Sequence, residues 1–162
     1  TVIFPLRLHT KGKQMPVVIV ACGMFFNVMN GFFLGYFFST LENYSWTWFI
    51  DARFILGVIL FIVGFYINVK ADSILIHLRK PGETHYVKPK DWLFTYISCP
   101  NHFGEIVEWL GFAILCWNLP ALAFFIWTAA NLIPRAISHH QWYKNNFNDY
   151  PEGRRAVIPG MI

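Results

Sequence analysis

The sequence predicts an all-α fold, a multispanning transmembrane helix bundle with about four spans. Two observations carry this prediction. Of the 162 residues, 56% are hydrophobic and only 14% are charged, whereas soluble domains carry about 25% charged residues. The apolar residues also gather in long stretches, and lipid forces such a stretch to satisfy its backbone hydrogen bonds internally. We therefore expect each stretch to form a helix.

The first expected span covers residues 16–38, which is long enough to cross a bilayer. Asn27 and Asn30 are its polar interruptions. Together with Gly31 and Gly35, they predict a helix that packs closely on its neighbours, because small residues let membrane helices approach one another.

The second span is predicted from the dense Ile, Leu, Val and Phe run at residues 54–69. Two shorter apolar stretches follow, and flanking polar turns extend them to helices at 101–117 and 120–140. Only a short joint around Asn118 separates these two helices, so we expect a tight helical hairpin.

Basic residues give the orientation of the four spans. Of the 13 lysines and arginines, only Arg53 falls on the opposite side from the others. The positive-inside rule then places the basic loop and the C-terminal segment on the cytoplasmic side of the membrane. That membrane is expected to be the endoplasmic reticulum or a bacterial inner membrane. Trp46, Trp48, Trp92 and Trp142 lie near span ends, as is typical of an interfacial aromatic belt.

Three polar stripes at helical spacing lie at the cytoplasmic ends of the expected helices. They are Asn68, Asp72 and Arg79; Asn101, Glu105 and Glu108; and Arg135, His139 and Tyr143. Residues three, four or seven apart share a helix face, so the first stripe requires the second helix to continue past Val69. Converging stripes would line a polar cleft, and ionisable residues in membranes are functional by default. A purely structural ion-pair network is the alternative.

Several classes of site are disfavoured. His139 and His140 are adjacent and point about 100° apart, so they are poor ligands for one metal ion. Glu105 and Glu108 are the only plausible further ligands, and we expect no metal site. Three cysteines without a CxxC pair indicate neither a disulfide framework nor zinc. The sequence has no GxGxxG motif after a strand and no P-loop motif. The net charge of +4 is weak evidence for a nucleic-acid partner, and we expect none.

A basic turn, LRKPGE at residues 78–83, follows the second span and is suited to holding an anionic cofactor at the mouth of the bundle. With this turn, a series of motifs resembles the steroid 5α-reductase family (3-oxo-5α-steroid 4-dehydrogenases). The motifs are NxxxD at 68–72, LRKPGE at 78–83, LFTY at 93–96, NHFGEIVEW at 101–109, LPALAF at 119–124, RAISHH at 135–140, WY at 142–143, DYP at 149–151 and IP at 158–159. Residues 1–162 are thus expected to form the larger, C-terminal part of one membrane domain of this family.

The resemblance implies an NADPH-dependent membrane enzyme that reduces the Δ4 double bond of a 3-oxo-Δ4 steroid to the 5α product by hydride transfer to C5. The cofactor contacts that it implies are Asn68, Asp72, Arg79, Tyr86, Asn101, Arg135, His139, Tyr143 and Arg154. The substrate contacts that it implies are Phe26, Glu105 and Trp109, with a catalytic role open to Glu105 near the nicotinamide. The tyrosine and glutamate that polarise the steroid carbonyl in the family are expected upstream of Thr1. We expect a monomer whose partners are the steroid and the lipid bilayer.

Three other readings stay open. A related reductase that acts on a polyprenol or an enoyl lipid is disfavoured by the steroid-type motifs. An isoprenylcysteine carboxyl methyltransferase-like membrane methyltransferase would use S-adenosylmethionine, but LRKPGE with Asn68 and Asp72 favours the reductases. A sterol-binding protein without activity is disfavoured by the nearly full set of cofactor residues.

Overall fold

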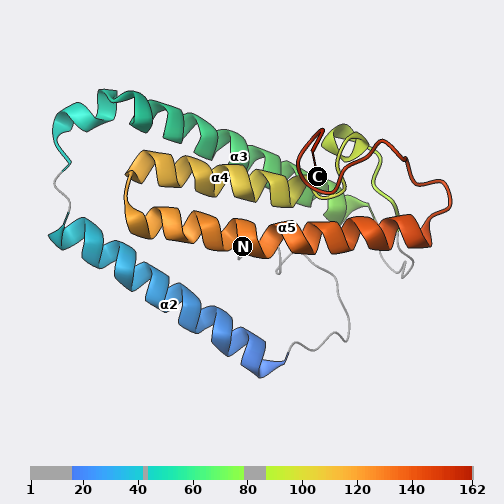
Figure 1. The fold of residues 1–162 in the computed structure, drawn as a ribbon, viewed down its shortest axis with the longest axis horizontal. Coiled ribbons are helices and arrows are strands. Elements are labelled where there is room, and N and C mark those ends of the chain that lie inside the picture. Colours follow the sequence, from blue (N-terminus) through green and yellow to red (C-terminus); the bar gives the residue numbers. More distant parts are fainter. Residues whose placement is uncertain (1–15, 42–43, 79–86, 162) are drawn as a thin grey trace.

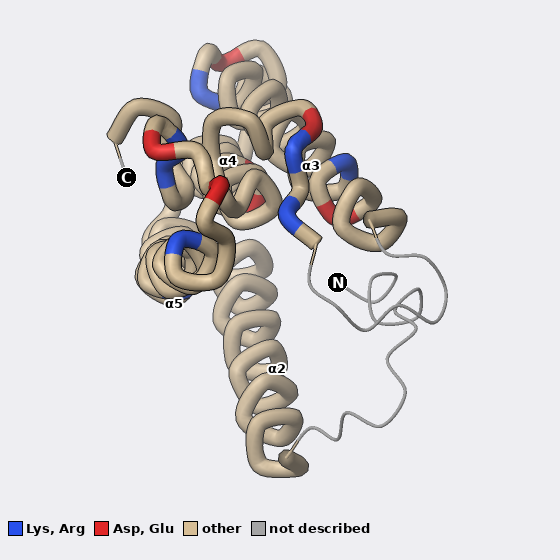
Figure 2. Tube along the Cα trace, turned by 90° about the vertical axis from the view of Figure 1, so that its right-hand side faces the viewer, with Lys and Arg blue, Asp and Glu red and all other residues tan. Residues whose placement is uncertain are grey.

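The computed structural model describes residues 16–41, 44–78 and 87–161. These residues form four α-helices and two short 3₁₀ helices. In chain order they are α2 (Val17–Thr40), η1 (Trp46–Ile50), α3 (Ala52–His77), η2 (Trp92–Thr95), α4 (Pro100–Cys116) and α5 (Leu119–Asn146). The described part contains no strand beyond an isolated bridge, so the all-α prediction is confirmed. Helices α3, α4 and α5 lie side by side, and α2 crosses away from them at an angle (Figures 1 and 2).

The predicted spans correspond to these helices with small shifts at their ends. By length and composition, α2, α3 and α5 are each able to cross a membrane. Helix α4 has 17 residues, which is about 25 Å of helix. Helix α3 continues to His77 rather than ending at Val69, as the first polar stripe required.

Glycines set the contact between α3 and α4, which run antiparallel. A Cβ atom added at Gly57 would lie 2.5 Å from the backbone nitrogen of Leu115 and 2.7 Å from the oxygen of Gly111. A Cβ atom at Gly104 would lie 2.5 Å from the backbone nitrogen of Asn68, and Gly64 meets the same stretch of α4. The two backbones therefore touch directly, which only glycine permits at these positions.

The hairpin between α4 and α5 closes as the sequence predicted. Trp117 ends α4 in the left-handed conformation, with φ of 50°. Asn118 then caps α5 by accepting a hydrogen bond of 2.9 Å from the backbone N–H of Ala121. Pro120 occupies the first turn of α5, where its missing N–H costs nothing.

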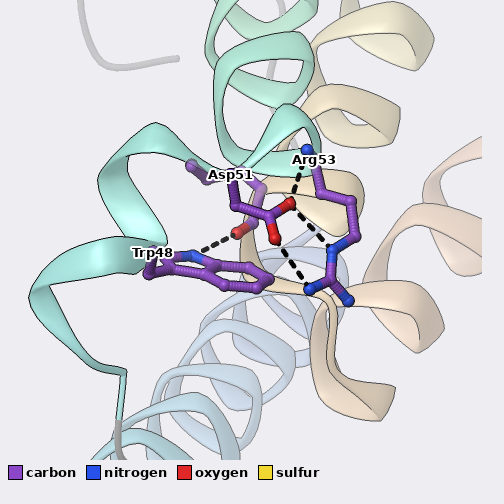
Figure 3. Close-up of polar contacts among 4 residues, drawn as sticks. Trp48, Asp51 and Arg53 are labelled. Carbon is purple, nitrogen blue, oxygen red and sulfur yellow. Dashed lines mark hydrogen bonds and ion pairs between the residues drawn. The ribbon is translucent and has the colours of Figure 1, made fainter.

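A clasp of polar and aromatic side chains ties this hairpin to the start of α3 (Figure 3). Trp48 donates from Nε1 to the Leu115 carbonyl oxygen at 3.3 Å, and Arg53 pairs with Asp51 through two hydrogen bonds of 2.9 and 3.0 Å. The Arg53 guanidinium also lies over the rings of Trp48 and Trp117, at 4.5 and 5.1 Å. The hydrogen bonds from Arg53 lower the pKa of Asp51 to about 2.

The opposite end of the bundle is closed by the C-terminal segment, residues 147–161. Its backbone pairs with the stretch before α4, through Ser98 N–H to the Arg155 oxygen at 2.8 Å and Cys99 N–H to the Ala156 oxygen at 3.1 Å. Val157 is fully buried with Cys99 and Ala136. This pairing fixes the segment against the first turn of α4.

The expectation of a closely packed first span is wrong for the described structure. Helix α2 has no buried residue, and a Cβ atom at Gly31 or Gly35 would meet nothing within 4 Å. Phe26 makes the aromatic contact that joins α2 to α5, by stacking on Trp127 and Phe124. Without a glycine partner in register, the small residues of α2 remain on open faces.

Candidate cofactor and substrate site

The polar stripes of α3 and α4 meet beside the glycine contact. The side chains of Asn101 and Asp72 lie close enough to interact, and so do those of Asn68 and Glu108. This pairing follows from the packing, because the backbone of Asn68 lies against Gly104, between these two α4 positions.

The stripe of α5 reaches the same place. Glu105 on α4 interacts electrostatically with both Asp72 on α3 and Arg135 on α5. Arg135 and His139 in turn interact with His102, whose ring centroid is 6.2 Å from that of His139. Three helices thus contribute to one group of polar side chains, which we call the polar cluster: Asn68, Asp72, Asn101, His102, Glu105, Glu108, Arg135 and His139.

His102 was missed by the sequence analysis. The available signal was its spacing, because it precedes Glu105 by three residues and therefore lies on nearly the same face of α4. The predicted stripe begins at Asn101 instead, one residue earlier on α4.

Two predicted cofactor residues lie in a second group, around Tyr150 in the C-terminal segment. The ring of Tyr143 stacks on that of Tyr150 at 5.7 Å, and the Arg154 guanidinium lies 4.9 Å from the same ring. Arg154 is buried and donates from Nη1 to the Pro89 oxygen at 3.2 Å, while its Nε has no hydrogen-bond partner among the described residues. Arg79 and Tyr86, the remaining predicted contacts, lie outside the described residues.

A buried lysine fastens this second group to the loop before η2. Lys88 donates from Nζ to the Asp149 carboxylate at 2.7 Å and to the Asp149 backbone oxygen at 2.8 Å. The hydrogen bond from Lys88 holds the pKa of the Asp149 carboxyl below its usual value. The C-terminal segment is therefore anchored by side chains as well as by its backbone.

The predicted substrate residues meet in an aromatic patch formed by Phe26, Trp109, Phe124 and Trp127. The ring of Phe26 stacks on Trp127 at 5.1 Å and on Phe124 at 6.0 Å. Trp109 meets Phe124 edge to face at 4.4 Å. Trp109 also follows Glu105 by one turn on the same face of α4, and the two side chains lie close enough to interact, so the aromatic patch adjoins the polar cluster.

These features define the class of protein as a helical membrane protein whose bundle holds a polar cluster next to an aromatic patch. Such a composite site suits one polar, charged ligand beside one flat, apolar ligand.

Comparison with known proteins identifies the family. The family model described as 3-oxo-5-alpha-steroid 4-dehydrogenase matches residues 13–162, and the chain belongs to this family. It is 46% identical over 156 residues to 3-oxo-5-alpha-steroid 4-dehydrogenase 2 of Sus scrofa, which covers 96% of this chain and 61% of the relative. It is 40% identical over 169 residues to Steroid 5-alpha-reductase DET2 of Arabidopsis thaliana, covering 98% and 63%. The resemblance found in the motifs is thus confirmed, and the chain spans about three fifths of the length of these relatives.

Proposed function

We propose that this chain forms the cofactor-binding region and part of the substrate-binding region of a membrane steroid 5α-reductase. The proposed reaction is NADPH-dependent reduction of the Δ4 double bond of a 3-oxo-Δ4 steroid to the 5α-steroid. The observation that carries the proposal is that Trp109 follows Glu105 by one turn on the same face of α4, which places the aromatic patch next to the polar cluster. A cofactor bound in the polar cluster and a steroid bound on the aromatic patch would then lie next to each other.

The donor set of the polar cluster fits NADPH. Arg135 and His139 are positioned on one face of α5 and suit phosphate oxygens, because a guanidinium binds them through two parallel hydrogen bonds. Asn68, Asp72 and Asn101 suit the hydroxyl and amide groups of the sugar and nicotinamide. Tyr143 and Arg154 supply further contacts from the second group, and Arg79 and Tyr86 are proposed from the family motifs. When bound, NADPH supplies the hydride that reduces C5 of the enone.

The chain's own residues orient the two ligands. Trp109 and Phe26 offer aromatic surface to the flat steroid, and Glu105 lies one helical turn before Trp109 at the edge of that surface. The apolar surroundings also keep water away from the reacting atoms.

The proposed topology places the polar cluster at the cytoplasmic side, in the endoplasmic reticulum or in a bacterial inner membrane. Lys88, Lys90, Arg154 and Arg155 lie at this end of the bundle, whereas the Arg53 clasp lies at the other end. Figure 2 views the polar end and shows charged residues on α3 to α5, while α2 has none. The positive-inside rule supports this orientation, which gives the site access to cytoplasmic NADPH. The protein is proposed to act as a monomer.

The cofactor is tested by thermal unfolding of the intact protein in detergent with NADPH, NADH or S-adenosylmethionine. Stabilisation by NADPH above NADH is expected, together with NADPH-dependent loss of the enone absorbance of a 3-oxo-Δ4 steroid. Stabilisation by S-adenosylmethionine alone would support the methyltransferase instead. Binding of steroid without any loss of enone absorbance would support a protein without activity.

The Trp109→Ala variant tests the assignment of the two regions. It removes aromatic surface next to Phe124 and should weaken steroid binding roughly 30-fold, with little change in NADPH affinity. Equal losses for both ligands, measured by titration, would remove Trp109 from the steroid region.

A further inference from the structure

Asn131 is a polar residue in the most apolar part of α5, outside the polar cluster. Between Leu119 and Pro134, the polar side chains of this helix are those of Thr128 and Asn131, and Thr128 is buried. Asn131 is exposed, and its Nδ2 donates to the backbone oxygen of Trp127 at 2.8 Å. An amide in the apolar part of a membrane helix is costly unless its hydrogen-bonding groups find partners.

The position of Asn131 on the helix places it next to the aromatic patch. At about 100° per residue, Asn131 lies about 20° around α5 from Phe124 and about 40° from Trp127. Along the axis it lies about 6 Å beyond Trp127 and about 6 Å before Arg135. One face of α5 therefore presents two aromatic rings, then an amide, then a guanidinium of the polar cluster.

The amide has hydrogen-bonding capacity to spare. Its hydrogen bond to Trp127 uses one of two N–H donors, and no described residue partners the Oδ1 acceptor. On this face, both groups are available to a ligand that covers Phe124 and Trp127.

We propose that Asn131 is a specificity-determining residue, which selects steroids that carry an oxygen substituent in addition to the enone. This inference rests on the proposed function. Every substrate of the proposed reaction carries the carbonyl conjugated to the double bond, so that oxygen cannot distinguish one substrate from another. A hydroxyl or ketone elsewhere on the ring system can pair with the Asn131 amide, and a steroid without it leaves the amide unpaired.

Asn27 on α2 supplies a matched control. Its Nδ2 makes the same local bond, to the Gly23 oxygen at 2.8 Å, and it is also exposed in an apolar helix. It lies about 100° around α2 from Phe26 and so does not share the face that meets the aromatic patch. If an amide on a lipid-facing helix surface were all that mattered, Asn27→Leu and Asn131→Leu would behave alike.

The test compares two 3-oxo-Δ4 steroids that differ only in a C17 hydroxyl, using the intact protein. Affinity is read from quenching of tryptophan fluorescence and turnover from kcat/KM. The wild type should prefer the hydroxylated steroid, and Asn131→Leu should reduce that preference about tenfold in both readouts, the effect of one buried hydrogen bond. Asn27→Leu should leave the preference unchanged, and Asn131→Gln should restore most of it. NADPH affinity should be the same in all variants.

Other outcomes overturn the inference. Equal loss for both steroids in Asn131→Leu would mean that the amide acts on the shared enone or on folding. An unchanged preference would mean that it does not contact the ligand. If the wild type binds both steroids without reducing them, the proposed reaction fails, and the affinity ratio still decides the role of Asn131. If it binds neither steroid, both proposals fail.

Discussion

The contact between α3 and α4 and the contact between α2 and α5 use similar residues in opposite ways. In the first, glycines on both helices stand in register and the backbones touch. In the second, the glycines of α2 face open space and the aromatic ring of Phe26 makes the contact. The polar cluster is thus built on a contact with no freedom to shift, and the aromatic patch on one that can re-pack around an apolar ligand.

A glycine substitution on each side of this comparison should give the largest difference. Gly104→Val pushes a side chain into the Asn68 backbone, which is flanked by the backbone of α3 and cannot move aside. We expect a loss of at least about 3 kcal/mol in stability, because this overpacking meets backbone rather than a flexible side chain. Thermal unfolding and the monodisperse fraction in detergent measure it.

Gly31→Val on α2 is the matched control, since a Cβ atom there meets nothing within 4 Å. It should unfold as the wild type does. Comparable destabilisation by the two variants would mean that glycine restricts both helices equally and would end the distinction between them.

The next largest effect concerns the ligand rather than folding. Arg135→Ala removes the guanidinium of the polar cluster and should raise the NADPH dissociation constant about 30-fold, the typical effect of a charged hydrogen bond of about 2 kcal/mol. Steroid affinity should change little. Lys144→Ala, an exposed cation in the last turn of the same helix, should change neither constant. Equal effects of the two variants would mean that Arg135 acts only through its positive charge and makes no specific contact with NADPH.

The sequence predicts the helices of this fold better than their contacts. Hydropathy located all four helices, but the apolar run of the second one ends at Val69, and only the polar stripe indicated that the helix continues beyond it. Asp72 is accommodated within the helix because Asn101 of α4 partners it. Seven-residue glycine spacing is visible in both α3 and α4, yet spacing alone does not reveal which helix faces which.

In the candidate site, too, the residues that share a helix face could be predicted, whereas the contacts between separate segments could not. Polar stripes at helical spacing identified most of the polar cluster, since residues of one face stay together in any packing. The separation of Tyr143 and Arg154 from it could not be foreseen. It depends on the path of the C-terminal segment, which pairs with Ser98 and Cys99 through backbone hydrogen bonds that leave no periodic signal in the sequence.

A smaller effect is expected from the ring that joins α2 to the bundle. Phe26→Ala removes the stacking on Trp127 and Phe124 and should raise the steroid dissociation constant about tenfold, while NADPH affinity stays the same. Phe33→Ala removes an exposed ring of the same helix and should have no effect on either ligand. A loss of NADPH affinity in Phe26→Ala would show that the two regions are coupled more tightly than their contacts indicate.

The smallest effect should come from pH, and it should not involve α2, because α2 contains no charged residue. The pKa of Asp149 is lowered in the folded protein by its hydrogen bond from Lys88. A lowered pKa contributes stability that is present above the unfolded value of 3.8 and is lost as the pH falls through the folded value. Anchoring of the C-terminal segment should therefore weaken only below about pH 4.

Two features keep this effect small. The Asp149 side chain is 73% exposed, so solvent screens its charge, and the hydrogen bond from Lys88 to the Asp149 backbone oxygen survives protonation. Hydrogen exchange of the amides of Ser98 and Cys99 should increase slightly below pH 4 in the wild type. Asp149→Asn should remove this pH dependence while leaving exchange in α2 unchanged. An equal response of α2 would mean that acid loosens the whole bundle and that the anchoring of the polar half is not what titrates.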